Sequence, residues 1–128
     1  MLLDTDFLID LQRGLRNQRA TGARRFADEH RSAVLQISLV TWMEFAEGFP
    51  SDREEECMRF LHDFTLLFPD EGVAWRASRL ARQLRNDGLT IGDHDTWIAA
   101  TALEHELTLV TRNVRHFQRV PGLQLLAY

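Results

Sequence analysis

Four polar side chains lie where they could together perform metal-dependent chemistry. Asp4 ends a short apolar run, Glu44 and Asp95 lie near the starts of two apolar segments, and Asn113 follows another apolar run. Clustered carboxylates favour a hard cation with oxygen ligands, Mg²⁺ or Mn²⁺. Such an ion clamps phosphate oxygens and activates water, so the pattern favours phosphodiester hydrolysis.

Asp95 is the most informative of these acids. At the period of a helix it shares a stripe with the apolar residues Ile98 and Ala99. A carboxylate on the core side of a helix is costly unless it is paired or binds a metal. Asp93 points roughly the other way, and we interpret it as the N-cap of this helix.

The positions of Glu44 and Asp6 leave alternatives open. Glu44 lies across its helix from Trp42 and Phe45, so periodicity alone fits a solvated residue as well as a ligand. Asp6 gives the end of the first strand a second carboxylate and could share the role of Asp4. The five histidines show no metal-ligand spacing, and we interpret them as surface residues.

Composition removes several other chemistries. All 15 basic residues are arginine, so no lysine is present for a phosphate-binding loop or a Schiff base. The one cysteine, Cys57, excludes an internal disulfide and a cysteine-rich zinc site. No run approaches the ~18 apolar residues of a membrane span, and no secretion signal is visible. A cytoplasmic protein without membrane contact is therefore the expectation.

Arginine is unevenly distributed although the formal net charge is −4. Residues 13–31 hold six arginines against two acids, and Arg112, Arg115 and Arg119 follow one another with no acid between them. Such segments could present a basic surface to nucleic acid, while solvated surface is the alternative that charge alone favours.

Strands and helices alternate along the chain. The pattern predicts strands at 2–3, 34–37, 66–68, 107–111 and 123–127, and helices at 7–11, 17–30, 41–47, 52–64, 71–87 and 94–106. Gly14 is expected to break the first helix and Ser51 to cap the fourth. The alternation predicts a single α/β domain over residues 1–128 with parallel strands, whose carboxyl ends would bring the four polar groups to one edge.

Three segments carry a family resemblance over essentially the whole chain. In order, LLDTDFLIDL, VTWMEFAEG and IGDHDTWIAATALEHELTLVTRNVRHFQRVPGL resemble the PIN-domain nucleases, and the VapC toxins of bacterial toxin–antitoxin pairs in particular. The resemblance implies a three-layer α/β/α sandwich with a central, mostly parallel sheet. It also implies a Mg²⁺-dependent endoribonuclease (Mn²⁺ being the alternative metal) that acts as a toxin.

The resemblance assigns roles to single residues. It implies that Asp4, Glu44 and Asp95 are the catalytic, metal-binding acids, that Thr5 and Asp6 flank the first of them, and that Thr111 and Asn113 orient ligands or water. Many relatives have Asp at the place of Asn113, which leaves a second metal open, and Asp6 or Asp93 could compensate in part.

The resemblance further implies an RNA substrate, a VapB-like antitoxin and a homodimer. Trp42, Phe45 and Phe49 are either a groove for an antitoxin helix or ordinary core. The segment Asp4-Thr5-Asp6 is also similar to the opening of haloacid-dehalogenase phosphatases, and the early acids are similar to those of phospho-receiver domains, but both of those families need a lysine. A degenerate PIN domain that only binds RNA or a partner is the remaining alternative.

Overall fold

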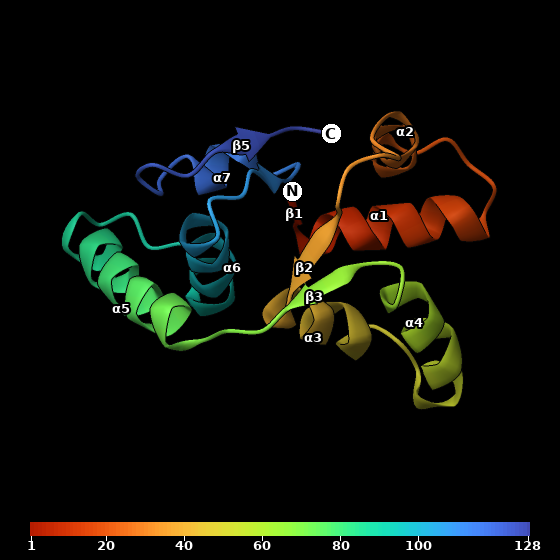
Figure 1. The fold of residues 1–128 in the computed structure, drawn as a ribbon, viewed down its shortest axis with the longest axis horizontal. Coiled ribbons are helices and arrows are strands. Elements are labelled where there is room, and N and C mark those ends of the chain that lie inside the picture. The colour runs from red at the N-terminus through yellow and green to blue at the C-terminus, as the bar shows by residue number, and fades with distance from the viewer.

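Five short strands form the central sheet of the computed structural model, which describes all 128 residues (Figure 1). The strands are β1 (Leu2–Leu3), β2 (Gln36–Ser38), β3 (Thr65–Leu67), β4 (Leu109–Val110) and β5 (Leu125–Leu126). Their order is β3-β2-β1-β4-β5, and every pairing is parallel. Parallel neighbours require crossover connections, which the helices supply.

Seven α-helices and one 3₁₀ turn connect the strands. They are α1 (Thr5–Arg16), α2 (Gly22–Glu29), α3 (Leu39–Glu47), η1 (Ser51–Arg53), α4 (Glu54–Leu61), α5 (Glu71–Asn86), α6 (Asp93–Glu104) and α7 (Val114–Phe117). None of these helices is both long and apolar enough to cross a membrane.

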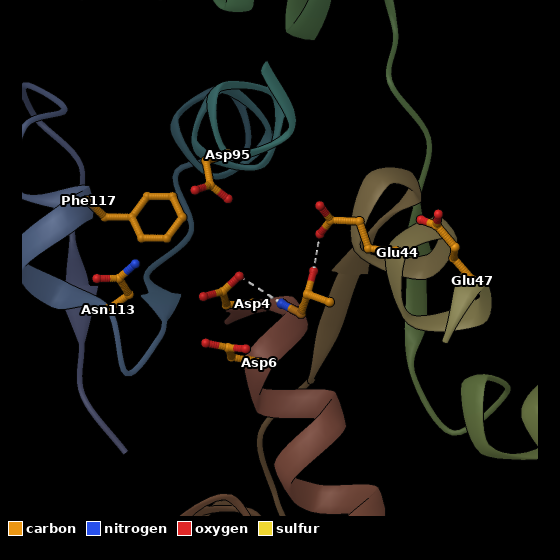
Figure 2. Close-up of a pocket in the computed structure, with 8 residues that line it drawn as sticks. Asp4, Asp6, Glu44, Glu47, Asp95, Asn113 and Phe117 are labelled. Carbon is orange, nitrogen blue, oxygen red and sulfur yellow. Dashed lines mark hydrogen bonds between the residues drawn. The ribbon is translucent and has the colours of Figure 1, made fainter. Parts of the chain in front are cut away.

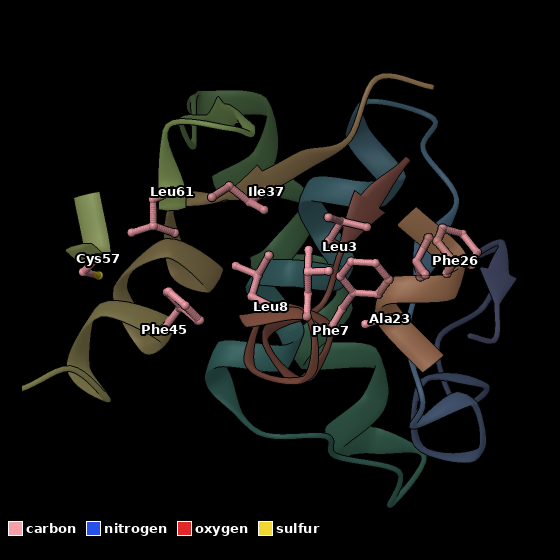
Figure 3. Close-up of a cluster of buried hydrophobic side chains, with 11 residues drawn as sticks. Leu3, Phe7, Leu8, Ala23, Phe26, Ile37, Phe45, Cys57 and Leu61 are labelled. Carbon is pink, nitrogen blue, oxygen red and sulfur yellow. The ribbon is translucent and has the colours of Figure 1, made fainter. Parts of the chain in front are cut away.

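Two hydrophobic clusters cover the two faces of the sheet. Leu3, Ile37 and Val110 lie side by side in the register and point into a cluster with α1, α2, α3 and α4 (Figure 3). Leu2 and Leu109 point the other way, into a cluster with α5, α6 and α7. Because neighbouring residues of a strand face opposite sides, this arrangement makes three layers. The predicted α/β/α sandwich is confirmed, and its sheet is wholly parallel.

The helix predicted over 71–87 is confirmed as α5. Asp70 caps it by accepting a hydrogen bond from the Val73 amide, and Val73, Ala77, Leu80 and Leu84 form its buried stripe. The first strand is confirmed at Leu2–Leu3, and the third has the predicted length but begins one residue earlier. The strands predicted over 34–37, 107–111 and 123–127 are shorter, since only two or three residues of each apolar run belong to the ladder.

The predicted helix break at Gly14 is wrong. The helix α1 continues to Arg16, and the arginine-rich helix begins only at Gly22, with Thr21 as its N-cap. Gly14 is buried, and a Cβ atom there would lie 2.7 Å from Thr21 Oγ1. The glycine therefore lets the following loop pack against α1 instead of ending the helix.

Two other expected helix starts are also wrong. Ser51 does not cap the fourth helix, because it begins the 3₁₀ turn η1 after Pro50, and α4 follows from Glu54. Asp93 is the first residue of α6 and not its N-cap, a place taken by Gly92 with φ of 90°. A positive φ strains any residue with a side chain, so glycine occupies the N-cap position although Asp93, beside it, is of a type that caps helices better.

Candidate active site

A pocket of about 350 Å³ opens at the carboxyl edge of the sheet (Figure 2). Eight residues line it: Asp4, Thr5, Asp6, Glu44, Glu47, Asp95, Asn113 and Phe117. They come from the starts of α1 and α6, from α3, and from the segment after β4. Five carboxylates thus share a pocket that no arginine lines, an arrangement that stays charged only at a large electrostatic cost or with a bound cation.

Asp4 lies at the centre of the site and is only 6% exposed. As the N-cap of α1, it accepts a hydrogen bond from the Thr5 amide at 2.7 Å, and its other oxygen accepts one from Thr111 Oγ1 at 2.7 Å. Burial nevertheless raises the pKa of its carboxyl to about 6, with the nearby acids Asp95 and Asp6 adding a smaller effect. Asp4 therefore changes charge close to neutral pH.

Thr111 and Asn113 form the wall behind Asp4. The Thr111 hydroxyl donates to Asp4 and accepts from the backbone N–H of Asn113 at 2.9 Å. This chain of bonds fixes the loop after β4, and Asn113 contributes its side chain to the pocket lining.

Glu44 lines this pocket and is half-buried. The Thr5 hydroxyl donates to one of its carboxylate oxygens, and His94 Nδ1 lies 2.8 Å from the other. Residues on three different helices are therefore joined at one carboxylate, and the bond from Thr5 couples Glu44 to the turn that holds Asp4.

Asp95 points toward the same space as Asp4 (Figure 2). His116 Nε2 lies 2.8 Å from one Asp95 oxygen and 3.1 Å from the Ile91 carbonyl oxygen. Because both neighbours are acceptors, Nε2 must carry the proton and donate to them. Burial raises the pKa of Asp95, and the bond from His116 opposes that change.

The remaining predicted residues lie at or outside the rim. Asp93 is exposed and lines a neighbouring hollow with His94, outside the acidic pocket. The Arg112 guanidinium lies 3.6 Å from Asp6 and 4.0 Å from Asp10, and Arg119 donates to the Thr90 carbonyl at 3.1 Å. Two of the three arginines predicted to bind RNA thus have partners within the chain.

Sequence reasoning missed His94 and His116. Both were interpreted as surface residues, but each bonds to a carboxylate of the pocket. Glu44 lies 50 positions before its partner His94, and Asp95 lies 21 positions before His116. No helical or strand period carries such a signal, although His116 belongs to the same short segment as Thr111 and Asn113.

The donor set fits a divalent cation, although no three Asp, Glu, His or Cys side chains are already close enough to enclose one. Glu44 has both oxygens engaged, and Asp95 has one engaged by His116. The pocket offers hard oxygen ligands, and a cation would stabilise the buried charge of Asp4, whose pKa is raised by burial.

The comparisons with known proteins agree with this fold. Residues 1–123 match the family described as PIN domain, and the chain therefore belongs to the PIN domain family. Ribonuclease VapC1 of Haemophilus influenzae strain R2866 is 32% identical over 128 residues, which cover 96% of this chain and 93% of that protein.

Two solved structures extend the likeness to three dimensions. The VapBC-1 structure from nontypeable Haemophilus influenzae has a chain that superposes with a TM-score of 0.78 at 29% identity, covering 98% of this chain and 96% of that one. A toxin–antitoxin complex from Klebsiella pneumoniae gives a TM-score of 0.72 at 30% identity, covering 98% and 94%.

Proposed function

We propose that this chain, as a single PIN domain over residues 1–128, is a metal-dependent endoribonuclease of the VapC type. The observation that carries the proposal is the meeting of Asp4, Glu44 and Asp95 in one pocket at the carboxyl edge of a parallel sheet. The chain's membership in the PIN domain family and its likeness to a relative named ribonuclease support the same activity.

Asp4, Asp95 and Glu44 would hold Mg²⁺, with Mn²⁺ as the alternative, directly or through water. When bound, the cation lowers the pKa of a water and stabilises charge on phosphate oxygens during hydrolysis. Asp4 must be ionised to bind it, and the hydrogen bonds from Thr5 and Thr111 favour that form. His116 fixes one oxygen of Asp95, which leaves the other directed into the pocket.

Thr5 and Asn113 have supporting roles in this proposal. Thr5 positions Glu44 through its hydroxyl while its amide holds Asp4, so one residue sets the spacing of two acids. The Asn113 amide orients water or substrate without adding charge, and the carboxylate of Asp6 lies at the rim beside Arg112. Outer contacts of this kind fix the orientation of metal ligands.

Purified chain is expected to cleave mixed cellular RNA in Mg²⁺ or Mn²⁺ and to lose that activity in EDTA, because the phosphodiester chemistry depends on the cation. Gel analysis of the products checks this, with the heat-denatured chain as a control for contaminating nuclease. A folded, metal-loaded chain that binds RNA without cutting it would support the degenerate, non-catalytic alternative.

We further propose that a VapB-like antitoxin and a second copy of this chain are its protein partners in the cytoplasm. The acidic pocket suits a guanidinium from the antitoxin, which pairs with carboxylates in bidentate fashion. Phe45 is buried core, so it cannot form the antitoxin groove suggested by the sequence, whereas Trp42 is only half-buried.

An apolar hollow of about 490 Å³ supports the proposed homodimer. Leu39, Val40, Trp42, Met43, Pro69, His94 and Trp97 line it, and Phe68, next to Pro69, is 66% exposed. Contiguous apolar surface of this kind marks protein interfaces.

Expression of this chain alone is expected to arrest growth, and co-expression of the protein encoded beside it should restore growth by occupying the acidic pocket. Colony counts measure the effect, with Asp4→Ala as the harmless control. Light scattering on the purified chain and complex reports the number of copies. Normal growth with folded chain present, or a monomeric chain at micromolar concentration, would contradict the corresponding part of the proposal.

A further inference from the structure

Five arginines gather where α1 ends and α2 begins: Arg13, Arg16, Arg19, Arg24 and Arg25, called the arginine cluster below. None of them forms an ion pair, whereas Arg31, Arg53, Arg76 and Arg112 each pair with an acid. The acid whose pKa Arg16 influences, Glu56, is bonded by Arg53 at 2.5 and 2.8 Å. The cluster is thus a positively charged surface without ion pairs, on a chain of net charge −4.

The local backbone holds these arginines together. The loop after α1 folds back, with the Arg19 amide donating to the Gly14 carbonyl at 2.9 Å. From α2, Arg24 donates to the same carbonyl at 3.5 Å, and Arg25 donates to the Ala20 carbonyl at 2.7 Å. Figure 1 shows α2 turning back over α1 as a result. The cluster is therefore a feature of the fold and not a flexible basic run.

One stripe of α1 connects the cluster to the acidic pocket. Asp6, Asp10 and Arg13 are spaced by one turn each and lie on the same side of the helix. Asp6 lines the pocket, and the Arg112 guanidinium lies 3.6 Å from Asp6 and 4.0 Å from Asp10, so it offsets part of the negative charge between the pocket and the cluster. At 1.5 Å per residue, Arg13 and Arg16 lie about 10 and 15 Å along α1 from Asp6.

We propose that the arginine cluster binds the phosphates of the RNA strand about three to five nucleotides from the bond being cut, given about 3.4 Å per nucleotide of stacked strand. The inference rests on the proposed ribonuclease function. A pocket of carboxylates repels a polyanion, so affinity for RNA must come from surfaces outside it. Guanidinium groups bind phosphate oxygens well. Because the cluster and the pocket lie along the same helix, an RNA strand held in the pocket can also reach the cluster, which favours the substrate strand over an acidic protein as the ligand of the cluster.

The test compares two double variants that remove the same charge. Arg16→Gln with Arg19→Gln alters the cluster, and Arg82→Gln with Arg85→Gln alters exposed, unpaired arginines on α5, across the sheet. Fluorescence anisotropy in EDTA measures the affinity for a single-stranded RNA of about 20 nucleotides at several salt concentrations. The slope of log affinity against log salt should shrink by ~0.7 for each phosphate that the cluster variant no longer binds, and it should stay unchanged in the control.

Further arms separate the outcomes. In Mg²⁺, the cluster variant should raise KM for the long RNA with kcat unchanged, and leave the kinetics on an RNA of about four nucleotides as they were. Melting temperatures confirm folding, and Arg13→Gln alone gives a milder second variant. An unchanged salt slope in both cluster variants overturns the inference. So does a cluster variant that keeps its affinity for RNA but no longer co-purifies with the protein encoded beside this chain. A changed slope in a chain that cuts no RNA supports the binding surface while the ribonuclease proposal fails.

Discussion

Asp95→Asn is expected to lower RNA cleavage by about 10³-fold or more, equivalent to ~4 kcal/mol of transition-state stabilisation, because it removes a ligand charge from the proposed metal site. The fold should survive, because Asn fills the same volume and still accepts the hydrogen bond from His116. Burial raises the pKa of Asp95, so losing its charge removes a desolvation cost, which offsets the weaker hydrogen bond that a neutral Asn accepts from His116. Initial cleavage rates and thermal melting of the same preparations check both parts.

Asp93→Asn is the matched control for this prediction. It makes the same chemical change two positions earlier, on an exposed residue outside the acidic pocket. Asp93 makes no capping hydrogen bond, so its replacement removes only a favourable charge in the first turn of α6. Cleavage should stay within about fivefold of the original rate, as a surface charge contributes at most ~1 kcal/mol. Equal loss in both variants, or full activity of Asp95→Asn, would contradict the assignment of Asp95.

The alternation of strands and helices, and the acids that follow the strands, were predictable because both depend on local signals. Short apolar runs separated by amphipathic segments indicate parallel crossovers, and an acid on the apolar stripe of α6 indicates a site. The same reasoning placed Asp4 at a strand end, and the structure brings Asp4 and Asp95 to one pocket. The roles of residues that follow from a helix or strand period could therefore be predicted from the sequence.

Glu44, His94 and His116 show where such reasoning stops. Periodicity placed Glu44 away from the apolar face of α3, which is correct, but the space on that side is the pocket. Its contact with His94 and the contact of His116 with Asp95 depend on how α3, α6 and α7 pack, which only the tertiary fold determines. The predicted helix break at Gly14 was wrong for a related reason. A glycine is required there because Thr21 approaches closely, and not because the helix ends.

Asp4→Asn is expected to make the metal-free chain more stable while abolishing cleavage. The folded-state pKa of Asp4, about 6, lies above its usual value of 3.8, so the folded chain holds this proton more tightly than the unfolded chain. Stability of the metal-free chain should therefore fall as pH rises from about 4 to about 6, and stay lower above that range. A shift of this size corresponds to about 3 kcal/mol above pH 6.

Part of that gain is offset by hydrogen bonding. Asn caps a helix as well as Asp, so the bond from the Thr5 amide is kept. The amide nitrogen then faces Thr111, whose hydroxyl loses its carboxylate acceptor at a cost of about 1 kcal/mol. The net expectation is a gain of about 2 kcal/mol at pH 7.5, shrinking to zero or below at pH 4, where Asp4 is protonated in the folded chain and nearly half protonated in the unfolded chain.

Urea unfolding in EDTA at pH 4 and pH 7.5 measures this difference for the original chain and Asp4→Asn. Repeating it at pH 7.5 with Mg²⁺ adds an internal check: a ligand that binds only the folded state stabilises it by mass action, so Mg²⁺ should raise the stability of the original chain and not of the variant. The reason is that Asp4 is both the most buried acid of the pocket and a proposed ligand. A variant that is less stable than the original chain at pH 7.5 in EDTA would show that Asp4 contributes to the fold through its hydrogen bonds more than its buried charge costs.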